Sequence, residues 1–154
     1  MSARAEGIGS RRESRERALS LLYEAEAKGC DPLEDVLAQL VLEPEPFAAD
    51  VVAGVSRHRA EIDALIGGVA RGWPLERMPV VDRNLLRMAV YELAHRPDVP
   101  TGAVISEAVE LAKEYSTDDS GGFVNGVLSR LATELRTAGD PPLLRSKPEG
   151  PPGP

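Results

Sequence analysis

Apolar residues recur along most of this chain at the i, i+3, i+4, i+7 spacing, which places them on one face of an α-helix. No stretch keeps the alternation of apolar and polar residues that is typical of a half-buried strand. The helical spacing fits seven windows, at residues 18–25, 33–40, 48–55, 62–69, 86–93, 105–112 and 124–131. The sequence therefore predicts an all-α fold of about seven helices.

Residues that begin helices agree with this pattern. Ser10 with Glu13, and Asp31 with Glu34, have the spacing of a capping box, and Pro32 would occupy the first helical position. Four further prolines fall between the windows or at their starts, where proline is tolerated: Pro46, Pro74, Pro79 and Pro100. We expect a helix to begin near each of these signals.

The length of 154 residues suits one domain with a sizeable core. Residues 1–9 are expected to be flexible, and residues 10–136 to form the helical domain. Residues 137–154 contain six prolines and three glycines, a composition typical of a disordered tail. Gly67 and Gly68 weaken the fourth predicted helix. Two three-helix groups are conceivable on either side of Trp73.

Charge is distributed unevenly along the chain. The formal net charge of −7 argues against a protein that coats nucleic acid with its whole surface, because attraction to phosphate requires a positive field. Residues 11–17 nevertheless carry four arginines and two glutamates, whereas residues 29–72 carry eight acids and three arginines. Any nucleic-acid site should therefore be local and close to the N-terminus.

Several functional classes lack the residues that they need. The single cysteine, Cys30, cannot form an internal disulfide, and with only His58 and His95 beside it we expect no metal site and no cofactor. No signal peptide and no run of eighteen apolar residues is present, so we expect a cytoplasmic protein. Neither a phosphate-binding loop nor a catalytic constellation is recognisable, and the sequence indicates no enzyme.

The first candidate site is the arginine-rich start of the first predicted helix. Positive charge at a helix N-terminus opposes the helix dipole, so helix stability does not explain these arginines. Guanidinium groups suit phosphates and base edges, which favours an RNA contact. The alternative is a solvated face on which the arginines pair with Glu13 and Glu16.

The second candidate site is the segment of residues 116–126, a polar turn that leads into the last predicted helix. One interpretation is structural: Asp118, Asp119 or Ser120 caps the helix, and Phe123 belongs to the core. The other is functional: Phe123 stacks on an unpaired base while the polar groups contact its edge. The segment by itself leaves both open.

Taken together, several blocks of the chain resemble the NusB antitermination family. The most specific block is residues 81–93 (VDRNLLRMAVYEL). Further blocks follow or precede it in the expected order, at residues 15–18, 22–23, 71–73, 98–100, 107–113 and 123–128. The similarity covers about residues 11–135. It implies two small helical bundles packed together and a non-catalytic role in transcription antitermination, in which boxA RNA of nascent ribosomal RNA leaders is bound together with NusE, a small-subunit ribosomal protein.

The resemblance also implies roles for individual residues. Arg11, Arg12 and Arg15 match an arginine-rich RNA-binding segment, and a second RNA-contacting region matches Asp119, Ser120 and Phe123. Tyr23 and Asp82 match positions associated with the NusE interface. The side of the helix around Arg83 and Arg87 is expected to be exposed and to add to this interface. Glu13 stands where related sequences can carry another arginine, so we expect weak RNA binding without the partner.

Two other functions stay open. Within the same resemblance, the main alternative is an RNA-binding module of the kind fused to ribosomal RNA cytosine methyltransferases. It could also be a helical adaptor that binds only proteins. The resemblance further implies that the protein acts in an antitermination complex with RNA polymerase. Whether it is a monomer or a homodimer stays open.

Overall fold

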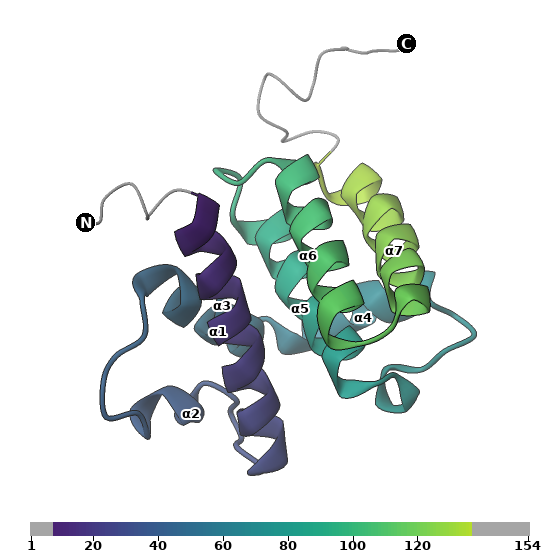
Figure 1. The fold of residues 1–154 in the computed structure, drawn as a ribbon. Helices are drawn as coiled ribbons and strands as arrows, with labels where there is room; N and C mark the ends of the chain where they lie inside the picture. The colour runs from purple at the N-terminus through teal and green to yellow at the C-terminus, as the bar shows by residue number, and fades with distance from the viewer. Residues whose placement is uncertain (1–7, 137–154) are drawn as a thin grey trace.

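The computed structural model of the chain describes residues 8–136, and over this range it contains helices and no strand. Figure 1 shows their arrangement. The elements are α1 (Ile8–Ala27), α2 (Asp35–Ala38), α3 (Pro46–Arg57), α4 (Arg59–Val69), the short 3-10 helix η2 (Leu75–Arg77), α5 (Val80–His95), α6 (Thr101–Tyr115) and α7 (Asp118–Arg136). The predicted all-α fold of seven helices is confirmed.

The helices form two groups that share one central helix. Helices α1, α2 and α3 pack together, and α4, α6 and α7 pack against α5, which also contacts α1 and α3. Nearly every residue of α5 from Asp82 to Leu93 is buried, as expected of a helix that is surrounded by others. The apolar side chains of both groups belong to one continuous core that runs through α5.

Polar side chains of α5 connect it to α1, α3, α4 and α7. Asp82 accepts a hydrogen bond from Ser120 of α7. Arg87 donates to Asp63 of α4, and other residues of α5 bind α1 and α3. Buried polar groups are stable only with such partners, so these pairs fix how α5 sits among the other helices.

Helix α3 approaches α5 at a glycine. A Cβ atom on Gly54 would overlap the ring of Tyr91, and the Tyr91 hydroxyl donates to Asp50 of α3 at 2.9 Å. The absence of a side chain at position 54 therefore lets the Tyr91 ring lie against the α3 backbone.

Two helices begin at other residues than the sequence predicts. Helix α1 begins at Ile8, so Ser10 lies inside the helix and does not mark its start. The second helix does not begin at Pro32, because residues 32–34 form a turn with i to i+3 hydrogen bonds and α2 has only four residues. Residues 1–7 and the predicted tail 137–154 lie outside the described residues.

Other boundary predictions are confirmed. Pro46 is the first residue of α3, and Pro79 and Pro100 directly precede α5 and α6. Helix α4 continues through Gly67 and Gly68, whose positions have open space around them. Among residues 8–136, no helix is both long and apolar enough to cross a membrane.

Candidate nucleic-acid interface

Arg12 belongs to α1, and its side chain is paired with two acids of α6. Its Nε donates to Glu107 Oε1 at 2.7 Å, and Nη1 lies 3.9 Å from Glu114 Oε1. The hydrogen bond to Glu107 is the main cause that raises the pKa of Arg12. The Arg12 side chain remains 32% exposed, so solvent or a phosphate can still reach it. The ion pairs of this arginine are thus with Glu107 and Glu114 of α6, and Glu16 of α1 adds only the attraction of its charge.

Arg11 stacks on an aromatic ring. Its guanidinium carbon lies 4.0 Å from the centre of the Phe47 ring, at the start of α3, and Arg96 approaches the same ring at 4.9 Å. Arg96 is held by Asp50 and Asp98. A hollow of about 320 Å³ opens next to Arg11, between the start of α1 and the segment that leads into α6. Arg11 is half-buried and lines this hollow.

Arg15 is buried. Its side chain forms a two-pronged pair with Glu92 of α5, with Nε donating to Oε2 at 2.9 Å and Nη2 to Oε1 at 2.7 Å. Only 4% of the residue is exposed. The guanidinium therefore already has its carboxylate partner inside the protein, and its position favours a structural role below the surface that Arg11 and Arg12 form.

The start of α7 is capped by Thr117, which was not among the residues expected to cap it. Thr117 Oγ1 accepts a hydrogen bond from the backbone N–H of Ser120, whereas Asp118 and Asp119 are exposed in the first turn. The Ser120 hydroxyl donates to the buried Asp82 Oδ2 at 2.7 Å. Ser120 thus fixes the start of α7 to the start of α5, and it is itself buried.

Phe123 packs edge-on against Trp73, with ring centres 4.7 Å apart and planes inclined by 62°. Both rings are half-buried, so each keeps part of its surface toward solvent. Asp119 lies one turn before Phe123 on the same face of α7 and is exposed. We call Trp73, Asp119 and Phe123 the α7 patch, and Arg11, Arg12 and Arg15 the arginine patch.

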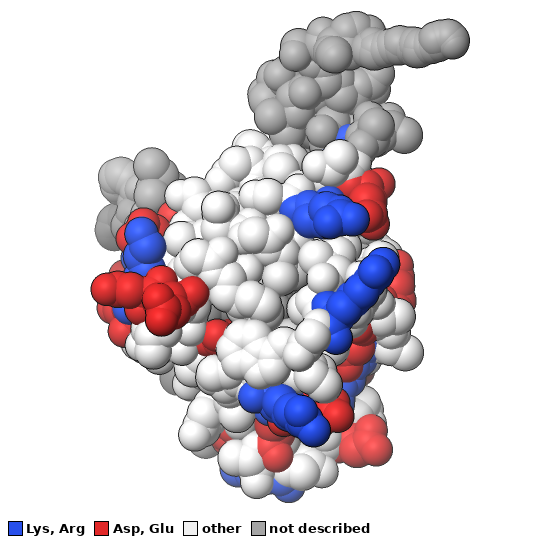
Figure 2. Space-filling model, turned by 90° about the vertical axis from the view of Figure 1, so that its right-hand side faces the viewer, with Lys and Arg blue, Asp and Glu red and all other residues white. Residues whose placement is uncertain are grey.

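The surface around the α7 patch is open and carries few charges. Gly122, Asn125, Gly126 and Ser129 are exposed along α7. Figure 2 shows the side of the molecule on which α7 lies in Figure 1, where a broad uncharged area is bordered by separate basic and acidic side chains. A ligand could therefore approach the α7 backbone closely.

Helix α6 lies between the two patches in Figure 1, and hydrogen bonds connect it to α1. A strand that contacts both patches has to cross the exposed face of α6. That face carries Ser106, Glu110 and Lys113, a mixture of a neutral, an acidic and a basic side chain. The two predicted RNA-binding segments therefore lie on opposite sides of α6 and do not contact each other.

The residues predicted for the partner surface divide into exposed and buried ones. Tyr23 of α1 is 54% exposed, so it is no part of the core. Arg87 is only 3% exposed and is held by Asp63 and Glu26, so the expectation that it lies on an exposed side of α5 is wrong. Asp82 is fully buried.

Arg83 is largely buried as well, because it joins α5 to neighbouring segments. It donates to Glu26 Oε1 at 2.9 Å and to the backbone carbonyl oxygens of Leu75 and Met78. Burial raises the pKa of Glu26, but the hydrogen bonds and charges of Arg83 and Arg87 lower it by more. The pKa is therefore lowered overall, which favours the carboxylate form. Glu26 therefore holds Arg83 and Arg87 next to the exposed Tyr23 face of α1.

Comparison with known proteins decides the family. The sequence model of the NusB family matches residues 12–133, which is most of the chain. The chain belongs to the NusB family. It is 50% identical over 127 residues to the transcription antitermination protein NusB of Thermobifida fusca, a match that covers 80% of this chain and 89% of that protein. The NusB-family chain is accordingly a transcription antitermination protein and not an enzyme.

Solved NusB structures share the fold. NusB of T. maritima superposes with a TM-score of 0.74 at 37% identity, covering 80% of this chain and 91% of that one. A structure of the antitermination factors NusB and NusE in complex with double-stranded RNA gives a TM-score of 0.68 at 29% identity, covering 82% and 98%. The predicted arrangement of two small bundles is that of a NusB protein.

Some residues of this NusB-family site were missed from sequence. Trp73 belongs to a block that resembles the family but was not assigned to a site, although its ring supports Phe123. Arg96 was not considered, although it shares the Phe47 ring with Arg11. Both lie far along the chain from their partners, so no local spacing could have indicated these contacts.

Proposed function

We propose that this protein is an antitermination factor that binds boxA RNA of nascent ribosomal RNA leaders together with NusE. The observation that carries the proposal is the family membership combined with the fold shared with a NusB that was solved with NusE and double-stranded RNA. The protein's acidic surface requires a confined RNA site, and the arginine patch and the α7 patch are the two candidates.

At the arginine patch, RNA has to compete with the protein's own acids. Arg12 can exchange Glu107 for a phosphate, because both side chains are partly exposed. Arg11 lies over Phe47 and can turn toward a strand in the adjacent hollow. Arg15 instead holds α1 on α5 through Glu92 and acts on RNA only by positioning the other two. Because these exchanges gain little net charge, affinity without a partner should be low.

At the α7 patch, the contact is proposed to be stacking. An unpaired base on the exposed part of Phe123 would be worth about 1–3 kcal/mol, and Trp73 keeps the ring from turning away. Asp119 is exposed one turn earlier and can accept hydrogen bonds from amino groups on a base edge. Ser120 contributes indirectly, because it binds Asp82 and sets the start of α7.

For NusE we propose the face of α1 around Tyr23. An exposed tyrosine offers a large apolar ring and a hydroxyl, a combination enriched in interfaces. Arg83 borders this face through Glu26, while Asp82 and Arg87 act from below by fixing α5. We further propose that the assembly acts with RNA polymerase in the cytoplasm, where ribosomal RNA is transcribed.

The test measures binding of labelled boxA RNA with and without NusE at several salt concentrations. Arg12→Glu and Phe123→Ala should each weaken cooperative binding, and Arg57→Glu, the same charge change on exposed α3 surface, should not. Arg11 and Arg12 are partly exposed, and Arg17, further along α1, is exposed. If each of these three arginines neutralises one phosphate, log K falls against log salt with a slope of roughly −2. Absence of boxA binding even with NusE would overturn the proposal and leave a protein-binding adaptor.

The same samples test the assembly state. Sedimentation with and without RNA distinguishes a monomer from the proposed alternative of a homodimer that covers one of these surfaces. A dimer that dissociates when RNA and NusE are added would indicate that self-association competes with them. A dimer that persists in the RNA complex would place its interface elsewhere.

A further inference from the structure

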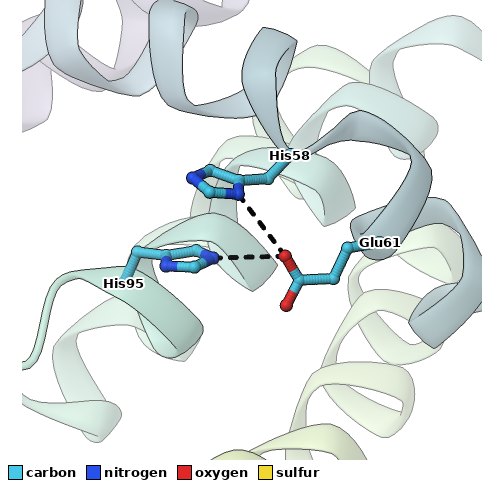
Figure 3. Close-up of side chains that lie close together, drawn as sticks. All are labelled: His58, Glu61 and His95. Carbon is cyan, nitrogen blue, oxygen red and sulfur yellow. Dashed lines mark hydrogen bonds and ion pairs between the residues drawn. The ribbon is translucent and has the colours of Figure 1, made fainter.

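The two histidines of the chain and one glutamate meet at a corner of the fold. His58 stands between α3 and α4, Glu61 lies in the first turn of α4, and His95 is the last residue of α5. Figure 3 shows both imidazole rings directed toward the same oxygen of Glu61. One ligand atom from each of the three residues lies within 4.8 Å of the other two. The sequence has no other histidine, so this corner holds the entire imidazole content of the protein.

The distances are those of a small metal site. His58 Nδ1 lies 3.5 Å and His95 Nε2 lies 3.4 Å from Glu61 Oε1. Ligands bound tetrahedrally at about 2.0–2.1 Å from a zinc ion are separated by about 3.3 Å. These contacts are long for hydrogen bonds, and an ion between the atoms would need only small adjustments.

The two rings are held together and have room to turn. His58 and His95 stack with centres 3.9 Å apart and planes inclined by 19°, and the Tyr91 ring lies 5.6 Å from that of His95. Nearly parallel rings must tilt toward each other before both lone pairs can meet one ion. The three side chains are between 31% and 51% exposed, so this tilt meets little resistance and an ion can enter from solvent.

We propose that His58, Glu61 and His95 bind a divalent transition-metal ion of the Zn²⁺ class, with water as the fourth ligand. Imidazole nitrogen with one carboxylate suits zinc, cobalt and nickel, whereas Mg²⁺ and Ca²⁺ prefer oxygen ligands. The ion would fasten the corner between α3 and α4 to the end of α5. The site would thus tie together helices of both bundles.

The test uses the untagged full chain, stripped of metal with a chelator. Cobalt titration should give one equivalent of binding and the visible absorption of a tetrahedral nitrogen and oxygen site, and zinc should displace the cobalt. Nuclear magnetic resonance of the imidazole nitrogens should show both histidines shifting together. At zinc concentrations about a hundred times the Kd, the thermal unfolding midpoint should rise by roughly 5–10 °C.

Variants separate the site from adventitious binding. His95→Ala and Glu61→Gln should each weaken metal binding at least tenfold. Cys30→Ser and Glu43→Gln, which alter the only thiol and an exposed acid elsewhere, should bind as the wild type does. Helical circular dichroism checks that each variant is folded. Binding that survives His95→Ala, or no saturable binding of zinc or cobalt below about 100 μM, overturns the proposal.

Discussion

The arginine patch and the α7 patch offer RNA opposite kinds of contact. In the arginine patch, Arg12 and Arg15 are each paired with an acid of another helix, so RNA gains an ion pair only where it replaces one. In the α7 patch, the Phe123 ring is supported by Trp73 and part of it faces solvent, so stacking replaces only water. The number of arginines in the arginine patch therefore overstates how strongly that patch attracts RNA. The specific affinity for RNA should depend more on the α7 patch.

The strongest test of this difference concerns Arg15. Removing one side of a buried ion pair leaves the other charge without a partner, which costs about 3–5 kcal/mol. Arg15→Ala and Glu92→Ala should each lower the free energy of unfolding by that amount, measured by urea titration. Arg12→Ala, which breaks a partly exposed pair, should lower it by less than about 1 kcal/mol. Equal effects of the two arginines would contradict the division of the patch into a buried and an exposed part.

The second test concerns Phe123. Phe123→Ala should weaken RNA binding by about 1–3 kcal/mol, and the loss should be the same at low and high salt because stacking releases no counterions. Phe123→Leu keeps an apolar side chain against Trp73 and serves as the control for stability. If Phe123→Ala retains full RNA affinity, the ring is a core residue and not a stacking surface. If the loss of RNA affinity disappears at high salt, the contact is electrostatic and not stacking.

The third test concerns Glu45, which caps α3 beneath the arginine patch. Its carboxylate accepts from Ser14 and from the backbone N–H groups of Phe47 and Ala48. Burial raises its pKa, but these hydrogen bonds and Arg11 outweigh burial, so the pKa is lowered. A lowered pKa contributes stability above the unfolded value of 4.5 that is lost as the pH falls through the folded value.

Glu45→Ala should therefore lower the free energy of unfolding by about 1 kcal/mol at pH 7. The difference from the wild type should shrink as the pH is lowered below 4.5, as measured by urea titration at several pH values. Glu134→Ala, at an exposed position near the end of α7, is the matched control for the loss of one surface carboxylate. A difference that grows toward low pH would contradict the assigned direction of the pKa shift.

The smallest expected effect concerns Glu107. Glu107→Gln removes the charge that competes with phosphate for Arg12, so RNA affinity should rise about threefold at low salt and return to the wild-type value at high salt. Fluorescence anisotropy with labelled boxA RNA measures both. An unchanged affinity at low salt would show that Arg12 remains paired within the protein when RNA binds.

The helices were predictable from sequence because their apolar spacing is local. All seven windows lie wholly or partly in helices, including α4 despite Gly67 and Gly68. The second window was overestimated: Leu33 and Val36 are buried as predicted, but they are presented by a turn and a helix of four residues. A short apolar spacing cannot distinguish these two backbones.

The site was less predictable because its decisive contacts join distant parts of the chain. The spacing of Arg11, Arg12 and Arg15 correctly placed them near one another on α1, but Arg15 is buried only because Glu92, far along the chain, faces it. Arg87 likewise could be assigned to the core only once Glu26 and Asp63 were seen around it. Charged residues are read from sequence as exposed, and only tertiary partners reverse that interpretation.

The central position of α5 determines how the molecule comes apart. Because α5 supplies core residues to both groups of helices, neither group can separate without exposing apolar surface of the other. The two bundles are therefore not independent folding units, and denaturation should proceed as one cooperative transition. A fragment that ends before α5 would keep the arginines of α1 but lack Glu92, and would have no fixed surface on which to present them.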